Sequence, residues 1–235
     1  MNIRLTILAL VVLMIPVGLS AQVRDNSAWA AWFNSYRVSD KLGIHFDAQV
    51  RSSDDLESVK NILIRPGLTW FFEENKNATF GYAFIRTRQT LEGIANPNLT
   101  EHRIWQQFIY NQKVSRASLT HRFRLEQRFI GQLSDDIFSQ RLRYFLRAQV
   151  PLKNTGGAAF SGGAFLALQN EVFLHLQNKD RLNGHIFDQN RAYLAVGYRF
   201  NPMVDLEAGY LNQASRGKER NVINNVVQFA IYTRF

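Results

Sequence analysis

The sequence contains no cysteine among its 235 residues. No disulfide framework therefore holds the fold, and no cysteine can carry the lipid that anchors a lipoprotein. Beyond its N-terminal region, the sequence also lacks an apolar run of the length that a membrane-spanning helix needs, roughly 17–25 residues. A chain with these absences either is soluble or crosses a membrane as β-strands.

The single long apolar run lies at the N-terminus. A short basic region, Met1–Arg4, precedes the apolar run Leu5–Val17, which ends at Gly18-Leu19-Ser20-Ala21. This order is typical of a secretory signal peptide, and we place its cleavage after Ala21. An N-terminal membrane anchor is the alternative, for which the run is short. We therefore predict a signal peptide at 1–21 and one domain at 22–235. Cleavage removes one basic residue and no acidic one, so the net charge of +9 becomes +8.

The basic residues are not gathered into a tail or a cluster. A sequence pI near 10.0 invites a nucleic-acid interpretation. The arginines instead recur at every second position within strand-like segments, and export removes most nucleic-acid partners. We predict no nucleic-acid partner.

The segment Leu119–Phe129 shows the pattern on which the fold prediction depends. Apolar residues dominate its odd positions and charged residues its even positions, where Arg122, Arg124, Glu126 and Arg128 lie. Alternation at a period of two predicts a strand with one apolar and one polar face. In a soluble sheet the apolar face would be the core; in a membrane barrel it would face lipid.

Ten further segments have strand-like length or alternation, which gives eleven predicted strands. They are 28–38, 42–51, 61–72, 79–89, 101–111, 117–131, 138–150, 164–175, 187–200, 203–214 and 222–235. Pro66 predicts a bulge, because proline cannot donate to a strand ladder. Arg86 and Arg88, on the apolar parity of their segment, predict a bulge or emergence into the headgroup region.

Short and long connections alternate along the chain, as they do in outer-membrane barrels. Pro151–Gly163 is the exception, a long glycine-rich link where a short one is expected. We predict an all-β fold, a transmembrane antiparallel up-and-down barrel of 10–12 strands. Because single-chain bacterial barrels have an even number of strands, the eleven segments leave two options. Either Gln22–Val38 contains a short extra strand or a piece that crosses the lumen, or Ala28–Val38 is not a barrel strand.

The last segment resembles the C-terminal strand that bacterial outer-membrane barrels present to their assembly machinery. It ends in an aromatic residue and has apolar residues at alternate positions, which makes Phe229, Ile231 and Phe235 the predicted assembly signal. Aromatic residues near strand ends fit interfacial girdles; they are Trp70, Phe72, Tyr198, Phe200 and Tyr232.

The cost of arginine in lipid sets the orientation of the strands. Each arginine near the bilayer midplane costs about 2–4 kcal/mol, so Arg122, Arg124 and Arg128 together would cost roughly 6–12 kcal/mol. That sum is comparable to the stability of a whole domain. We therefore predict that these side chains face the lumen.

Several motifs resemble a family of Bacteroidetes-type outer-membrane proteins that is catalogued as a domain of unknown function. They are Arg65-Pro66-Gly67-Leu68, Gly81-Tyr82-Ala83-Phe84, Glu101-His102-Arg103-Ile104-Trp105-Gln106-Gln107, His121–Arg128, Gln189-Asn190-Arg191 and Glu207-Ala208-Gly209-Tyr210. The resemblance covers essentially the whole mature chain. It implies a β-barrel in the outer membrane and brings no catalytic residues.

The parity of each strand predicts a cluster of charges in the lumen. Its members are Arg65, Arg103, Arg122, Arg124, Glu126, Arg128, Arg141, Arg143, Arg147, Glu171, Arg191 and Glu207. One interpretation is a structural ion-pair network. The other is a narrow anion-preferring pore or pocket, because basic residues outnumber acidic ones and arginine suits phosphate and carboxylate.

The alternative function is an outer-membrane lipid-modifying enzyme of the hydrolase or deacylase type. Such enzymes need a serine beside a histidine base. His102 and His121 have outward parity, but no histidine has the His-x-Ser spacing.

We predict no catalytic residue, metal site or cofactor. The acidic pairs Asp54-Asp55 and Asp135-Asp136 could bind calcium, but such pairs in loops are more often solvated. The expected partners are outer-membrane lipids, lipopolysaccharide and the barrel-assembly machinery; an adhesin is a third possibility.

Overall fold

The computed structural model describes residues 22–88, 98–133, 135–153 and 159–235. The predicted signal peptide, 1–21, lies outside the described residues. Within these ranges no helix is long and apolar enough to cross a membrane.

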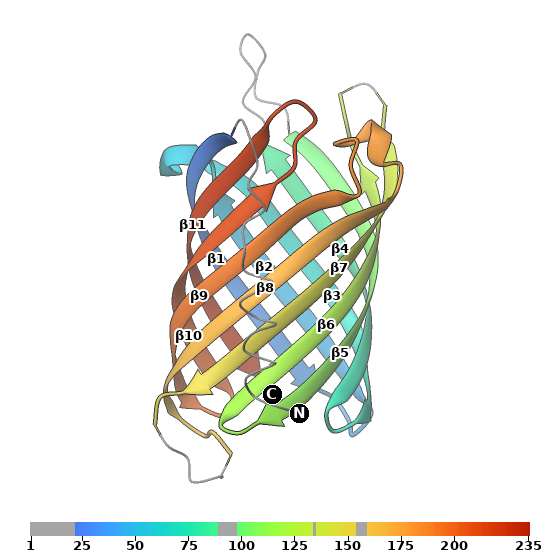
Figure 1. Cartoon of the computed structure of the whole chain (residues 1–235). Helices are drawn as coiled ribbons and strands as arrows, with labels where there is room; N and C mark the ends of the chain where they lie inside the picture. The colour runs from blue at the N-terminus through green and yellow to red at the C-terminus, as the bar shows by residue number, and fades with distance from the viewer. Residues whose placement is uncertain (1–21, 89–97, 134, 154–158) are drawn as a thin grey trace.

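Eleven strands form one closed barrel in which neighbours in sequence are neighbours in space (Figure 1). They are β1 Gln22–Arg37, β2 Leu42–Ser52, β3 Val59–Glu73, β4 Lys76–Arg88, β5 Asn98–Val114, β6 Ala117–Ile130, β7 Ile137–Pro151, β8 Gly163–Gln177, β9 Phe187–Asn201, β10 Val204–Ser215 and β11 Asn221–Arg234. The predicted all-β barrel of 10–12 strands is confirmed.

The barrel closes through a parallel pair, so the prediction of a wholly antiparallel sheet is wrong at one seam. β1 pairs with β11 from Gln22 opposite Asn221 to Ser35 opposite Arg234. An odd number of alternating strands necessarily brings the first and last together in the same direction. Both explanations that we offered for the odd count are wrong for the described residues. β1 is a full barrel strand that begins six residues before its predicted start, and no further strand precedes it there.

The two ends of the barrel carry different connections. Short turns at 38–41, 74–75, 115–116 and 202–203 lie at one end, which we call the short-turn end. Longer connections lie at the other, the long-loop end, and include the 3-10 helices η1 Asp54–Leu56 and η2 Lys179–Arg181 (Figure 1). As predicted, the link between β7 and β8 is the exception, long but at the short-turn end.

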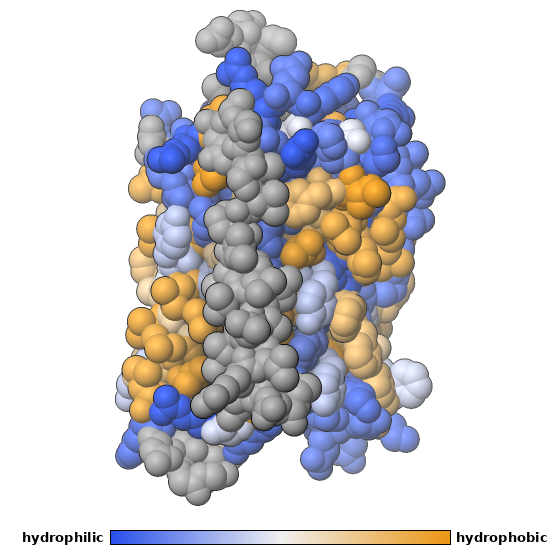
Figure 2. Space-filling model, viewed as in Figure 1, coloured by the Kyte–Doolittle hydropathy of each residue, from blue (hydrophilic) through white to orange (hydrophobic). Residues whose placement is uncertain are grey.

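Alternation along each strand separates the two faces of the wall. On β6, Phe123 and Phe129 are exposed on the outside, whereas Arg124 and Glu126 are buried in the lumen. In Figure 2 hydrophobic residues gather around the middle of the visible face, and hydrophilic residues gather at both ends. The sheet is therefore apolar outside and charged inside, as predicted for β6.

Two local predictions have different outcomes. The predicted bulge at Pro66 is wrong, because the β3–β4 register is the same before and after it. Arg86 and Arg88 lie exposed near the long-loop end of β4 without a register shift. The bulge is therefore wrong for these residues, and emergence into the headgroup region stays a prediction.

Glycines in the wall make room for large aromatic side chains inside the lumen. A Cβ at Gly81 would lie 2.2 Å from the Trp105 ring, and one at Gly197 would lie 2.2 Å from the Phe165 ring. Both aromatic side chains are fully buried. Trp105 thereby presents a fixed face to the lumen, on which an arginine described below stacks.

Candidate functional site in the lumen

Glu126 is the centre of an ion-pair network on the inner wall of strands β5 to β9. Arg141 donates to its Oε2 from Nε at 3.0 Å and from Nη2 at 2.7 Å, and Arg143 donates to its Oε1 from Nη1 at 2.5 Å. Arg103 lies 3.6 Å away. Because Glu126 is only 1% exposed, these cations are the groups that compensate its burial.

The same arginines link Glu126 to other carboxylates. Towards the long-loop end, Glu101 accepts from Arg103 and from Arg128. Across β7 and β8, Glu171 accepts from Arg143 at 2.7 Å and from Arg122 at 2.8 Å. The result is a continuous network in which each carboxylate is shared by two or more arginines.

Asp188 joins this network through an irregularity in the sheet. The register of β8 and β9 shifts between Phe173 and Leu174, which leaves Asp188 as the additional residue on β9. Its carboxylate accepts from Arg141 at 2.7 Å and lies 3.5 Å from His175. Simple alternation along β9 would not have identified this lumen residue.

Separate ion pairs lie on the remaining wall and towards the short-turn end. Arg65 donates to Asp47 at 2.6 Å. Arg147 pairs with Glu207. Arg199 binds the carboxylate of Asp205 in a bidentate manner, from Nε to Oδ1 at 2.7 Å and from Nη2 to Oδ2 at 2.8 Å. Arg234 also donates to Oδ2 of Asp205.

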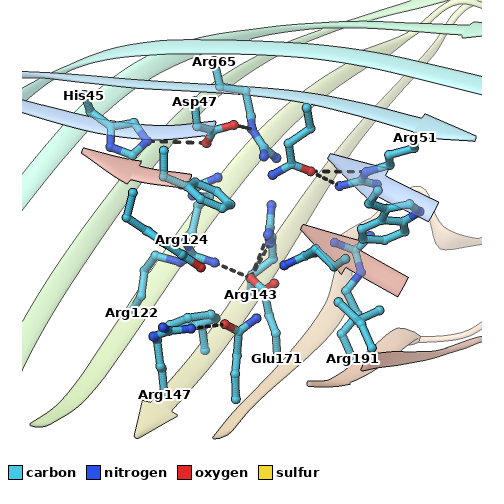
Figure 3. A pocket seen from close by; sticks show the side chains of 18 residues that line it. His45, Asp47, Arg51, Arg65, Arg122, Arg124, Arg143, Arg147, Glu171 and Arg191 are labelled. Atoms are coloured by element: carbon cyan, nitrogen blue, oxygen red, sulfur yellow. Dashed lines mark hydrogen bonds and ion pairs between the residues drawn. The ribbon is translucent and has the colours of Figure 1, made fainter. Parts of the chain in front are cut away.

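A cavity of about 210 Å³ lies inside the barrel among these groups (Figure 3). Seven arginines line it, against two carboxylates, those of Asp47 and Glu171. The arginines are Arg51, Arg65, Arg122, Arg124, Arg143, Arg147 and Arg191. Figure 3 shows them reaching towards the cavity from strands on different sides. The wall therefore carries a formal excess of positive charge.

The rest of the cavity wall combines aromatic and apolar side chains with His45 and three glutamines, Gln49, Gln169 and Gln228. Trp29 and Leu211 belong to a cluster of buried apolar residues on the inner side of β1 and β8 to β11. Nearer the short-turn end, Phe33 and Tyr232 stack with ring centroids 4.9 Å apart. Tyr232 thus corrects our expectation of an interfacial girdle residue, because it has the inward parity of Arg234.

All twelve residues of the predicted charge cluster lie on the inner wall. Seven of them line the cavity: Arg65, Arg122, Arg124, Arg143, Arg147, Glu171 and Arg191. The other five, Arg103, Glu126, Arg128, Arg141 and Glu207, form ion pairs around it. Arg51 was missed, although it shares the inward parity of Asp47 and alternation alone was enough to include it.

The residues of the predicted assembly signal lie on the outer surface. Phe229 is 58% exposed, Ile231 44% and Phe235 55%. Phe235 also closes the seam, because its backbone N–H donates to Ser35 and its carbonyl accepts from the N–H of Arg37.

The two outward histidines lie among aromatic and amide groups. His102 is hydrogen-bonded to the hydroxyl of Tyr82 at 2.5 Å, and His121 to Tyr144 and Gln112 at 2.9 Å each. No serine takes part in these contacts. Among the described residues there is also no group of three acidic or histidine side chains that could hold a metal ion.

The comparisons with known proteins identify a family. A family model described as "Protein of unknown function (DUF2490)" matches residues 26–224. The chain belongs to this family. The matched range begins in β1 and ends four residues into β11, so it spans most of the barrel. No curated protein matches the chain, and no solved structure does.

Proposed function

We propose that this DUF2490 member is an outer-membrane β-barrel whose lumen takes up small anions, as a narrow anion-preferring pore or pocket. The observation that carries the proposal is the cavity wall, where seven arginines face two carboxylates. A positive excess in a confined space of low dielectric attracts anions and repels cations. The network around Glu126 and Glu171 holds two of them, Arg122 and Arg143, in place.

The outer surface supports the membrane setting. Large apolar side chains are exposed on most strands, among them Leu68, Phe80, Leu194, Val196 and Phe229. In water so large an apolar surface favours association, whereas in a bilayer it is the lipid-facing band of a barrel. Outer-membrane lipids and lipopolysaccharide are then its surroundings. The barrel-assembly machinery would recognise Phe229, Ile231 and Phe235.

The test is ion selectivity after reconstitution into planar bilayers. With a potassium chloride gradient across the bilayer, we expect a reversal potential of the sign that chloride preference gives. Arg51→Gln removes one lining charge that forms no ion pair with any residue the structure describes, and it should reduce this preference. Lys179→Gln is the matched control, because Lys179 pairs with Asp180 in an exposed loop. Cation preference in the wild-type protein would contradict the proposal, and silence at all voltages would remove the pore and leave the pocket.

A further inference from the structure

Three of the arginines that line the cavity differ from the others in their partners. Arg51, Arg124 and Arg191 form no ion pair in the described part of the chain, whereas Arg65, Arg122, Arg143 and Arg147 each have a carboxylate partner. The excess charge of the cavity is therefore concentrated on three identified side chains.

A glutamine occupies the place of the missing carboxylate beside each of the three. Arg51 donates to Gln49 from Nη2 at 2.6 Å and from Nε at 3.2 Å. Arg124 donates to Gln107 in the same two-pronged way, at 2.7 and 3.1 Å. The contact of Arg191 with Gln189 is longer, 3.5 Å. An amide oxygen accepts these hydrogen bonds as a carboxylate would, but it leaves the positive charge uncompensated.

The same guanidinium groups also stack on the faces of aromatic rings. Arg51 and Arg191 lie over the ring of Trp29, with centroid distances of 3.8 and 5.1 Å, and Arg191 also lies over Phe173 at 4.8 Å. Arg124 lies over Trp105 at 4.4 Å, and Trp105 is itself fixed against Gly81. Stacking orients a guanidinium group without neutralising it.

The hydrogen-bonding capacity of these groups is also unfilled. A guanidinium has five N–H donors. In Arg191 the buried Nε has no hydrogen-bond partner, and the same is true of Nε in Arg122, which lines the same cavity. Buried donors of this kind are uncommon in folded proteins, because each one costs free energy when it is left without an acceptor.

We propose that Arg51, Arg124 and Arg191 form a binding site for one compact oxyanion with at least two negative charges, of the sulfate or phosphate class. Arg51 and Arg191 lie over the same Trp29 ring, and Arg124 lines the same cavity of about 210 Å³. Three charged groups on the wall of so small a cavity match such an ion in charge and in the number of donors. Gln49, Gln107 and Gln189 position the arginines and keep the site cationic while it is empty. The proposal rests on the proposed anion-handling lumen and specifies where in it the anion binds.

The test uses the folded protein in detergent and follows its thermal unfolding by the gel-mobility change of barrels. Sulfate and phosphate are compared with chloride and nitrate at equal ionic strength. We expect the two divalent anions to raise the unfolding midpoint, and a ligand at 100 times its Kd to raise the folded-to-unfolded ratio about 100-fold. Equal effects of all four anions would overturn the site.

Conversion of the glutamines to glutamate locates the binding. In Gln49→Glu, Gln107→Glu and Gln189→Glu, a carboxylate of the same shape replaces the amide and neutralises the neighbouring arginine. Each variant should therefore weaken sulfate binding by about tenfold or more. Each also gives an unpaired arginine a partner, which favours folding. Gln132→Glu, in an exposed loop, is the control for net charge. Unchanged sulfate binding in all three variants would place the anion elsewhere and overturn the proposal.

The two proposals fail separately. If sulfate does not stabilise the wild-type protein but the bilayer shows chloride preference, the three-arginine site is removed and an anion-preferring lumen remains. Sulfate stabilisation that disappears in the glutamate variants, with a bilayer that stays silent, would leave the site in a closed pocket.

Discussion

Glu126 is the residue on which the largest number of charges in the lumen depends. It is almost fully buried and accepts hydrogen bonds from Arg141 and Arg143, and Nη1 of Arg103 lies 3.6 Å from its Oε2. At the scale of single residues, the question is what the barrel loses when one member of such a network becomes neutral. Breaking a buried pair is costly, because the remaining charges keep their burial and lose their partner.

We expect Glu126→Gln to reduce the free energy of unfolding by about 3–5 kcal/mol, the range for a broken buried ion pair. The measurement is urea-induced unfolding in detergent, followed by the mobility shift on unheated gels. Glu73→Gln is the control, because Glu73 forms an exposed pair with Lys76, and such pairs contribute roughly 0–1 kcal/mol. Similar losses in both variants would show that the network does not stabilise the fold.

At the scale of elements, the connection between β7 and β8 stands out at the short-turn end. Its Phe160 packs edge-on against Phe165, with centroids 5.9 Å apart. Arg199 lies over the Phe160 ring at 4.7 Å and donates to its carbonyl at 2.8 Å. Because Phe165 points into the lumen, its contact with Phe160 places this part of the connection against the inner wall of the barrel.

Phe160→Ala should therefore widen the lumen at the short-turn end. If the lumen conducts, we expect a higher single-channel conductance in planar bilayers and unchanged anion preference, because the arginines of the cavity stay in place. Leu152→Ala, at an exposed position on the same connection, provides the comparison. An unaltered conductance in Phe160→Ala would mean that the narrowest point of the lumen lies farther from the short-turn end, among the arginines of the cavity.

At the scale of the whole molecule, the parallel seam fixes where β1 begins. Since β1 runs alongside β11, its first residues lie at the long-loop end and Phe235 lies at the opposite end. In bacterial outer-membrane barrels the long loops face outwards and the short turns face the periplasm. With an even number of strands, both ends of the barrel sheet would lie on the same side.

Val23 should consequently be accessible from outside the cell. The chain has no cysteine, so Val23→Cys is a unique attachment point for a maleimide too large to pass through porins. We expect it to react on intact cells, whereas Ser39→Cys, in the turn after β1, should react only after the outer membrane is permeabilised. The reverse pattern would contradict the seam or the orientation, and heat-dependent gel mobility of both variants verifies that each is folded.

Much of this arrangement was readable from the sequence, because strand alternation is a local property. The pattern of Leu119–Phe129 placed Arg124 and Glu126 on one face, and the cost of arginine in lipid turned that face inwards. The same reasoning assigned the inner wall of most strands and the outward position of Phe229. Alternation fails where the chain leaves the regular pleat, as at Asp188. Other predictions were wrong because they came from general rules and not from alternation, as for the even number of strands and the bulge at Pro66.

The sequence by itself determined the class of fold, the direction of the charged faces and the positive excess of the interior. Only the tertiary structure decided which charges meet, because the partners come from distant strands: Arg122 and Glu171 are 49 residues apart, and Arg147 and Glu207 are 60. Closure of the barrel, with its parallel seam, brings such residues within hydrogen-bond distance. It also brings Arg124 beside Gln107 of the neighbouring strand. Gln49 and Gln189, by contrast, precede Arg51 and Arg191 by two residues, so alternation alone places each pair on one face of its strand.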